Sequence, residues 1–197
     1  MPDPAALKAE LRALALGRRA ALDEDVRRES SAQAAARLRA LLKPGETVSL
    51  FWPMRGEIDP RGLIADVLAA GGRIAMPVVE GRRMFFRAFD GEDSLENGVF
   101  GTRHPHPGQP VLDPDLIVAP LAAFDRRGGR LGYGAGYYDN AIADLKRRGR
   151  PFRLAGIAFA CQEFDKIPLE PHDEPLPLIA TERELIRAGP IEGRLDA

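Results

Sequence analysis

The hydrophobic positions of the chain change their spacing near residue 45. Before it, alanine, leucine, arginine and lysine dominate, and apolar residues recur three to four positions apart, which predicts helices over 4–21 and 26–42. Asp3 suits the cap of the first helix, and Pro4 suits its first turn. We therefore expect an N-terminal helical pair. The apolar face of its first helix consists of Leu7, Leu11 and Leu14.

Short β-branched and aromatic runs follow, which is typical of buried strands. Strands are expected at 47–52, 73–79, 84–89, 116–120 and 153–159. Helical spacing returns at 60–70 and 137–148. Strands that alternate with helices predict a mostly parallel sheet covered on both faces. The expected fold class is therefore α/β, a three-layer α/β/α arrangement preceded by the helical pair.

The chain has 197 residues, which suffices for one well-buried core and is short for two independent domains. We expect a single domain over 1–197, made of the helical pair at 1–42, an α/β core at 46–188 and a tail at 189–197. Residues 90–115 are polar and rich in proline, which predicts a long surface loop and a candidate lid.

Charge and cysteine content narrow the function classes. The formal net charge of -1 gives no field for gathering nucleic acid or anionic lipid, so an anionic ligand must be held by local groups. Apolar runs stay far below the roughly 18 residues of a membrane span. Cys161 is the single cysteine, which excludes an internal disulfide, and we interpret it as a small buried apolar residue. The N-terminus lacks a basic-then-apolar signal, so we expect a cytoplasmic protein. We also expect it to be a monomer.

A glycine-rich segment carries the clearest chemical signal. It follows a buried strand and runs into a helix that begins near Tyr137, so its backbone can approach a ligand closely while the helix N-terminus attracts negative charge. Arg130 adds a full positive charge, and phosphate is the natural ligand. Glycine-rich turns often hold no ligand, so an empty turn remains the alternative. The glycines of this segment are Gly128, Gly129, Gly132, Gly134 and Gly136.

The spacing of these glycines fits neither standard nucleotide-binding loop. A dinucleotide fingerprint has two residues before its last glycine, and a Walker loop has lysine and serine or threonine where Tyr137 and Tyr138 stand. Asp139 lies in the first helical turn, where a carboxylate is stabilised by the helix dipole and can hold a hard cation. Asp173 is a second acidic candidate, since magnesium on ATP needs only one or two protein carboxylates.

Residues 129–139 resemble the Arg-Leu-Gly-x-Gly-x-Gly-Tyr-Tyr-Asp signature of the 5-formyltetrahydrofolate cyclo-ligase family, also called methenyltetrahydrofolate synthetase. Three weaker segments follow the order of that family: Lys8 to Arg12, residues 51–59, and residues 168–173 with Thr181 and Glu182. Two departures stand out. Residues 175–177 replace a second aspartate that the family usually carries, and Ala135 stands where some members have lysine.

The resemblance implies an ATP- and Mg²⁺-dependent cyclisation of 5-formyltetrahydrofolate to 5,10-methenyltetrahydrofolate through a phosphorylated formyl group. It implies Arg130 and Asp139 as catalytic residues, and Asp139 and Asp173 as Mg²⁺ ligands. The implied ATP-binding residues are Lys8, Arg12, Arg130, Leu131, Gly132, Tyr133, Gly134, Ala135, Gly136, Tyr137 and Tyr138. The implied folate-binding residues are Trp52, Glu57, Tyr133, Gly134, Ala135, Gly136 and Tyr137.

Two other functions remain open. One is a sugar-phosphate isomerase or coenzyme A transferase on a similar α/β framework, and the other is a folate- or nucleotide-binding protein without turnover. His104 and His106 form a pair that resembles a metal site but lacks the further ligands that zinc requires. We interpret His172 as a surface neighbour of Asp173.

Overall fold

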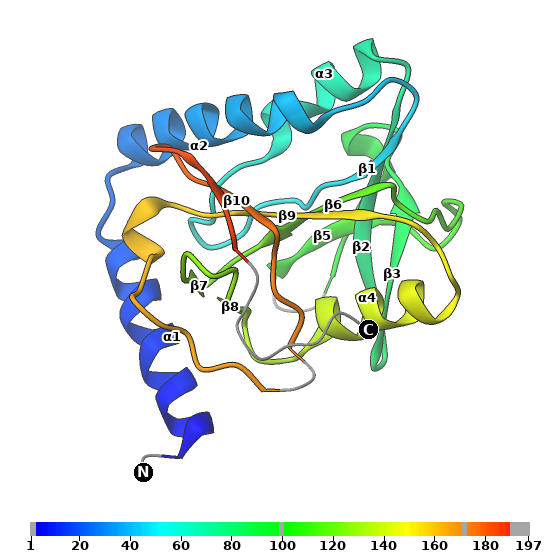
Figure 1. Ribbon diagram of the computed structural model, residues 1–197. Helices are drawn as coiled ribbons and strands as arrows, with labels where there is room; N and C mark the ends of the chain where they lie inside the picture. Colours follow the sequence, from blue (N-terminus) through cyan, green and yellow to red (C-terminus); the bar gives the residue numbers. More distant parts are fainter. Residues whose placement is uncertain (1–2, 99–100, 171–172, 190–197) are drawn as a thin grey trace.

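Seven strands form one mostly parallel sheet in the computed structural model, which describes residues 3–98, 101–170 and 173–189 (Figure 1). The strand order is β11-β10-β9-β6-β1-β2-β3, in which only the edge strands β11 and β3 pair antiparallel to their neighbours. The strands of this sheet are β1 Thr47–Ser49, β2 Arg73–Glu80, β3 Arg83–Ala88, β6 Leu116–Pro120, β9 Arg153–Ile157, β10 Leu178–Ala180 and β11 Leu185–Arg187. The expected sheet is confirmed.

Helices cover both faces of this sheet (Figure 1). The α-helices are α1 Pro4–Ala20, α2 Glu24–Leu38, α3 Ile64–Ala69 and α4 Tyr137–Arg147, and the 3-10 turns are η1 Arg39–Leu41, η2 Arg61–Leu63, η3 Glu92–Ser94 and η5 Ala160–Gln162. In β2, Ile74 and Met76 pack with α2 and α3, whereas Ala75 packs with α4. Successive strand residues point to opposite faces, so a strand that is covered on both, such as β6, is apolar along its whole length. The three-layer α/β/α arrangement is therefore confirmed.

Helix α1 lies outside these layers, beside the small hairpin of β7 (Ala123–Phe124) and β8 (Arg130–Leu131). Asp3 caps it as expected, because its Oδ1 accepts from the N–H of Ala5 at 3.1 Å. The predicted apolar face is wrong at one position. Leu14 is 50% exposed, and Ala15 is fully buried in its place. The helix therefore turns a face with small and basic residues toward the protein.

Two predicted loops contain strands. The 90–115 segment folds back as the hairpin of β4 (Leu95–Asn97) and β5 (Arg103–Pro105). The glycine-rich segment begins with β8, so it is not a continuous loop. In both places the strands have only two or three residues and include polar side chains, so they lack the apolar run that makes a strand visible in sequence.

One other expectation changes in detail. Cys161 is half-buried and packs against the rim of the core, so it is less enclosed than expected. Its thiol pKa is raised by burial.

No helix in the described part of the chain combines the length and apolar character that a membrane crossing needs. His172 lies outside the described residues.

Candidate functional site

The site lies where the winding of the sheet reverses. From β1 the chain passes through α3 to β2 on one side, whereas β6, on the other side of β1, continues through α4 to β9. The gap beyond the carboxyl ends of β1 and β6 is thus a topological switch point, where open α/β sheets bind their ligands. The segments that follow these two strands, 50–59 and 121–136, carry most of the predicted site residues.

A buried carboxylate shapes the approach to the signature. Asp125 is fully buried, and its Oδ1 accepts from the N–H groups of Arg127 and Gly129, both at 2.9 Å. Its Oδ2 accepts from the N–H of Ile167 at 2.8 Å. A buried carboxylate requires such donors, and here they join the turn after β7 to the segment after β9. Asp125 was not singled out from the sequence, because one aspartate in a charged stretch gives no sign of burial.

The glycines of the signature serve two purposes. A Cβ at Gly128 would lie 2.3 Å from a backbone carbonyl oxygen, and a Cβ at Gly129 would lie 2.9 Å from the Asp125 carboxylate, so both are required for packing. Gly132 and Gly136 face open space. Gly134 and Gly136 have φ values of 100° and 66°, which other residues rarely adopt. Only the later glycines therefore leave room for a ligand.

The N-terminus of α4 presents unused donors to that space. Its cap residue, Gly136, makes no side-chain capping bond, and the helical pattern starts with Asn140 N–H to Gly136 C=O at 3.0 Å. The N–H groups of Tyr137, Tyr138 and Asp139 thus have no acceptor within the helix. An uncapped helix N-terminus is suited to bind an anion.

Three cations project from one face of α1. Residues 8, 12 and 19 follow spacings of four and seven, which place them on a single helical face. Lys8 Nζ lies 2.6 Å from Asp173 Oδ2 and 2.7 Å from Glu170 Oε2. Burial lowers the pKa of Lys8, but its hydrogen bonds with Asp173 and Glu170 outweigh burial, so the pKa lies above its ordinary value. Arg12 Nε donates to the carbonyl oxygen of Gly132 at 2.7 Å.

Arg130 and Asp139 form the second ion pair of the site. Arg130 Nη2 lies 2.5 Å from Asp139 Oδ1, with the two side chains 7% and 27% exposed. Arg130 Nη1 also donates to the carbonyl oxygen of Glu174. Burial lowers the pKa of Arg130 below its ordinary value, although the charges of Asp139, Glu174 and Asp173 act in the other direction. The predicted catalytic pair is therefore brought together by the fold.

The two predicted magnesium ligands are compatible with that ion. Asp139 accepts hydrogen bonds from Arg130 and, at 3.4 Å, from the N–H of Glu174, and both fall on Oδ1. Within residues 3–98, 101–170 and 173–189, no cluster of three or more acidic, histidine or cysteine side chains gathers around one point to hold a cation. Magnesium on ATP needs few protein ligands, because phosphate and water oxygens complete its shell. Asp139 and Asp173 are therefore compatible with a Mg²⁺ ion whose remaining ligands are phosphate or water oxygens.

Two of the predicted folate-binding residues, Trp52 and Glu57, follow β1. Glu57 Oε2 accepts from the N–H of Met54 at 3.0 Å. Burial raises the pKa of Glu57, and hydrogen bonds from Tyr133 and Met54 with the charges of Arg19 and Arg55 oppose this increase only in part. In its ionised form this carboxylate can accept hydrogen bonds from neutral N–H donors.

Trp52 is more enclosed than expected. The guanidinium carbons of Arg61 and Arg103 lie 4.4 and 4.8 Å from its ring centroid, and the ring of Phe89 lies at 6.3 Å. Trp52 remains half-buried at the carboxyl end of β1. A folate ring that contacts Trp52 would therefore also meet Arg61 or Arg103, neither of which was predicted.

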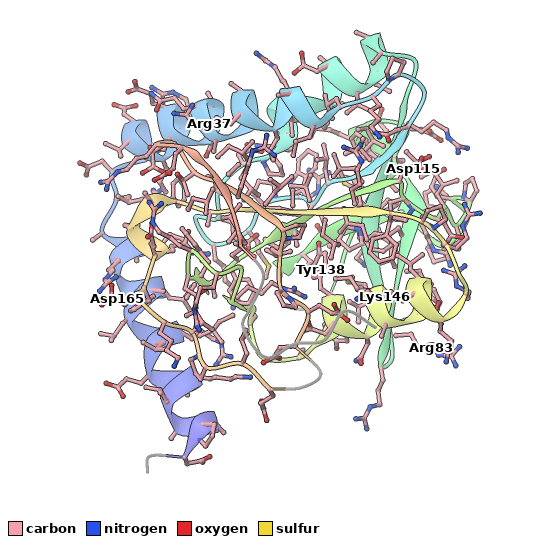
Figure 2. The ribbon with its side chains drawn as sticks, viewed as in Figure 1. Arg37, Arg83, Asp115, Tyr138, Lys146 and Asp165 are labelled. Atoms are coloured by element: carbon pink, nitrogen blue, oxygen red, sulfur yellow. The ribbon has the colours of Figure 1, made fainter. Side chains whose placement is uncertain are left out.

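Two predicted ATP-binding side chains point elsewhere. Leu131 is buried with Ala15 and Ile167, so only its backbone remains available to a nucleotide. The Tyr138 hydroxyl is buried and has no hydrogen-bond partner among the residues that the structure describes, and burial raises its pKa. Figure 2 shows Tyr138 on the inner side of α4. Both side chains are therefore part of the interior.

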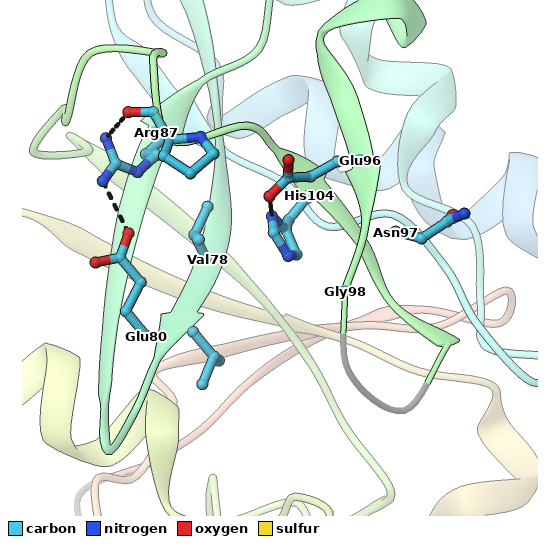
Figure 3. Close-up of a pocket in the computed structure, with 9 residues that line it drawn as sticks. Val78, Glu80, Arg87, Glu96, Asn97, Gly98 and His104 are labelled. Atoms are coloured by element: carbon cyan, nitrogen blue, oxygen red, sulfur yellow. Dashed lines mark hydrogen bonds and ion pairs between the residues drawn. The ribbon is translucent and has the colours of Figure 1, made fainter.

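A cavity of about 670 Å³ lies between β2, β3 and the β4–β5 hairpin (Figure 3). Its polar side chains pair with one another, Arg87 with Glu80 at 2.8 Å and His104 with Glu96 at 3.9 Å. None of the predicted site residues lines it. The assignment of the site therefore rests on the ion pairs and the helix N-terminus.

The fold and these contacts define a class: a doubly wound α/β protein with a basic, glycine-rich site at its switch point. Residues 4–182 match the model of the 5-formyltetrahydrofolate cyclo-ligase family. The chain is 30% identical over 174 residues to the 5-formyltetrahydrofolate cyclo-ligase of Escherichia coli K12, covering 83% of this chain and 94% of that one. It is 28% identical over 192 residues to the Mycolicibacterium smegmatis enzyme of the same name, covering 92% and 96%.

Solved structures agree with this match. The 5,10-methenyltetrahydrofolate synthetase of Aquifex aeolicus is similar with a TM-score of 0.75 at 30% identity, covering 97% of this chain and 96% of that one. The Mycoplasma pneumoniae synthetase shares the fold with a TM-score of 0.71 at 23% identity, covering 89% and 98%. The chain belongs to the 5-formyltetrahydrofolate cyclo-ligase family. It is therefore an enzyme, and the isomerase, transferase and non-catalytic alternatives lose their support.

Proposed function

We propose that the protein uses ATP and Mg²⁺ to close 5-formyltetrahydrofolate into 5,10-methenyltetrahydrofolate, with release of ADP and phosphate. The observation that carries the nucleotide part is the pairing of Lys8 with Asp173 and of Arg130 with Asp139 beside the uncapped α4 N-terminus. Cations suited to phosphate thus lie beside carboxylates suited to magnesium. An ATP–magnesium complex offers both kinds of charge at once.

The proposed reaction needs no nucleophile from the protein. The γ-phosphoryl group of ATP passes to the formyl oxygen, and the bond to the β,γ-bridging oxygen breaks to leave ADP. The folate N10 then attacks the formyl carbon, loses its proton, and expels phosphate together with the former formyl oxygen. Phosphoryl transfer of this kind depends on positioning and on neutralisation of charge.

We name the two halves of the site by the ligand that each would bind. The phosphate side is defined by the residues that pair or contact near the α4 N-terminus: Lys8, Arg12, Arg130, Asp139 and Asp173. The folate side is defined by the residues after β1 and their neighbours: Trp52, Glu57, Arg19 and Tyr133. Tyr137, at the start of α4, lies in sequence between Tyr133 of the folate side and Asp139 of the phosphate side, and would contact either ligand.

On the phosphate side, ligand binding would exchange partners. Lys8 and Arg130 would turn from their carboxylates to phosphate oxygens, while Arg12 and the open N–H groups of α4 add further donors. Asp139 and Asp173 would hold Mg²⁺, which supplies neutralisation of charge on the transferred phosphoryl group. The same four charged side chains are thus balanced with and without ligand.

On the folate side, Glu57 would accept from the N3–H and amino group of the pterin, with Trp52 against the ring.

We also propose that residues 1–197 act as one domain and as a monomer, because Lys8 near one end of the chain and Asp173 near the other meet in one site. We further propose a cytoplasmic location. The chain has a single cysteine, Cys161, so it forms no internal disulfide and needs no oxidising compartment.

Transfer of the formyl oxygen tests the mechanism. With 5-formyltetrahydrofolate labelled by ¹⁸O in the formyl group, the released phosphate is expected to carry the label, with ADP and methenyl product formed in equal amounts. Label in water would contradict phosphorylation of the formyl oxygen. ADP formation without methenyl product would contradict the cyclisation itself.

A further inference from the structure

Arg19 is a buried cation that the proposed chemistry does not use. Only 5% of the residue is exposed, at the C-terminal end of α1. The helix dipole favours a positive charge there, but it gives no reason to remove that charge from water. Burial of a guanidinium is costly unless hydrogen bonds compensate it, so its partners indicate its purpose. The adjacent Arg18 shows the contrast, because it is exposed and reaches backbone carbonyls around η5.

The partners of Arg19 belong to the folate side. Nη1 donates to the hydroxyl oxygen of Tyr133 at 2.6 Å, and Nη2 donates to the carbonyl oxygen of Arg55 at 3.0 Å. The Tyr133 hydroxyl also interacts with the Glu57 carboxylate, and this interaction lowers the pKa of Glu57. One guanidinium therefore connects α1, the signature loop and the turn after β1.

The turn at residues 54–57 contains a strained backbone conformation. Arg55 has a φ of 49°, in the left-handed region that residues with a side chain rarely adopt. Met54 and Glu57 close the turn by a backbone hydrogen bond of 2.9 Å and by the bond from Met54 N–H to the Glu57 carboxylate. The bond from Arg19 to the Arg55 carbonyl holds the centre of the turn. The direction of the Glu57 carboxylate thus depends on Arg19 in two ways.

We propose that Arg19 is a positioning residue, which acts through Tyr133 and the 54–57 turn to hold the Glu57 carboxylate toward the pterin of the substrate. This inference rests on the proposed folate role of Glu57. Arg19 itself contacts neither ligand. Its effect is therefore confined to folate affinity and leaves the phosphate side unchanged.

The electrostatic surroundings of Glu57 support this assignment. Burial raises its pKa, and the Arg19 charge is one of the few influences that lower it. Without Arg19, protonation of Glu57 would occur at higher pH, and the protonated form is the poorer acceptor for pterin N–H groups. The groups that face Glu57 or its turn are Arg19 from α1, Arg27 from α2, Tyr138 from α4, Tyr133 from the signature loop and Arg55 from the turn itself.

The test is a double-mutant cycle on folate affinity. Calorimetric Kd values for 5-formyltetrahydrofolate, without ATP, are compared for wild type, Arg19→Met, Glu57→Gln and the double variant. Loss of one hydrogen-bonded charge is expected to weaken binding about tenfold in either single variant. On the Glu57→Gln background, Arg19→Met is expected to cost less than about twofold, because its target is gone.

Three further measurements separate positioning from general damage. Between about pH 6 and 9, the Kd of Arg19→Met is expected to rise toward acid more steeply than that of wild type. Arg19→Lys restores part of the affinity, and Tyr133→Phe reproduces part of the loss while leaving Arg19 in place. Arg18→Met, one position away on α1, leaves the Kd unchanged.

Each outcome decides between specific alternatives. An equal loss on both backgrounds, or no loss in Arg19→Met and Tyr133→Phe, would overturn the positioning role. Wild-type affinity in Glu57→Gln would instead remove Glu57 from the proposed folate site, which is a separate failure. Trp52 is the single tryptophan, so its fluorescence reports whether the turn after β1 keeps its native surroundings in each variant.

Discussion

The phosphate side and the folate side differ in how their charged groups contact each other. On the phosphate side, cations and carboxylates contact each other directly, as Lys8 does Asp173 and Arg130 does Asp139. On the folate side, Arg19 reaches Glu57 through the hydroxyl of Tyr133. A direct ion pair can be exchanged for a ligand that offers the same charges, whereas an indirect contact keeps its geometry when the ligand binds. The phosphate side is therefore suited to partner exchange and the folate side to fixed recognition.

Removal of the exchangeable carboxylates should have the largest effect. Asp139→Asn and Asp173→Asn each retain the size of the side chain but lose the charge that would hold Mg²⁺. We expect kcat to fall by about 10²–10³-fold, the range for removal of one preorganised transition-state contact. The measurement is the rate of methenyl formation at saturating ATP and Mg²⁺.

Folate affinity without ATP should change little in these variants, because the carboxylates lie on the phosphate side. The matched control is Asp144→Asn on the same helix, whose carboxylate pairs with Arg147 and Arg148. Full turnover in both Asp139→Asn and Asp173→Asn would refute the magnesium assignment. A loss of equal size in Asp144→Asn would point to general damage of α4.

Lys8→Met tests partner exchange, because this change should weaken the binding of one ligand and strengthen the binding of another. Loss of the ammonium removes a phosphate donor, so the Kd of a non-hydrolysable ATP analogue should rise about 10–30-fold. The same change removes the cation that occupies Asp173, so Mg²⁺ without nucleotide should bind more tightly than in wild type.

Calorimetric titrations with each ligand alone check both directions. Lys166→Met, an exposed lysine in the segment after β9, is the control and should match wild type. Weakening of both ligands, or of neither, would count against partner exchange.

Glu57→Gln tests the fixed side through stability. The pKa of Glu57 is raised in the folded protein, so the group favours folding below its ordinary pKa and loses that contribution as pH rises through the folded pKa. At about pH 8 the ionised, buried carboxylate therefore opposes folding, and glutamine does not. We expect Tm to rise by about 3 °C at that pH, and the difference to shrink toward about pH 4.

Scanning calorimetry across this range gives the result, with Glu10→Gln on exposed α1 surface as the neutral control. A Tm that falls at alkaline pH would mean that Glu57 stabilises the turn more than its burial costs.

Arg103→Met should have the smallest effect. Its guanidinium packs on Trp52 from the β4–β5 hairpin, and one cation–π contact contributes about 0.5–1 kcal/mol at a partly exposed site. Folate Kd should therefore rise only about 2–5-fold. Arg82→Met, in the turn between β2 and β3, controls for the lost charge. A loss above about 30-fold would mean that Arg103 contacts the substrate directly.

The fold and the residues of the phosphate side could be predicted from the sequence more completely than the residues of the folate side. Long apolar runs such as 116–120 identified the sheet, and the uninterrupted signature placed Arg130 and Asp139. The burial of Asp125 and the contact of Arg103 with Trp52 depend on segments distant in sequence, so no local pattern reveals them. Arg19 could have been predicted as a site residue, because it lies seven positions after Arg12 on the same helical face.

A spectrophotometric assay with purified protein and 5-formyltetrahydrofolate, with and without ATP and Mg²⁺, tests the central claim most directly. Absorbance of 5,10-methenyltetrahydrofolate should grow only when ATP and Mg²⁺ are both present, because the phosphate side exchanges its ion pairs for both charges together. Growth without ATP, or equal growth with ATP alone after removal of divalent cations, would contradict the account.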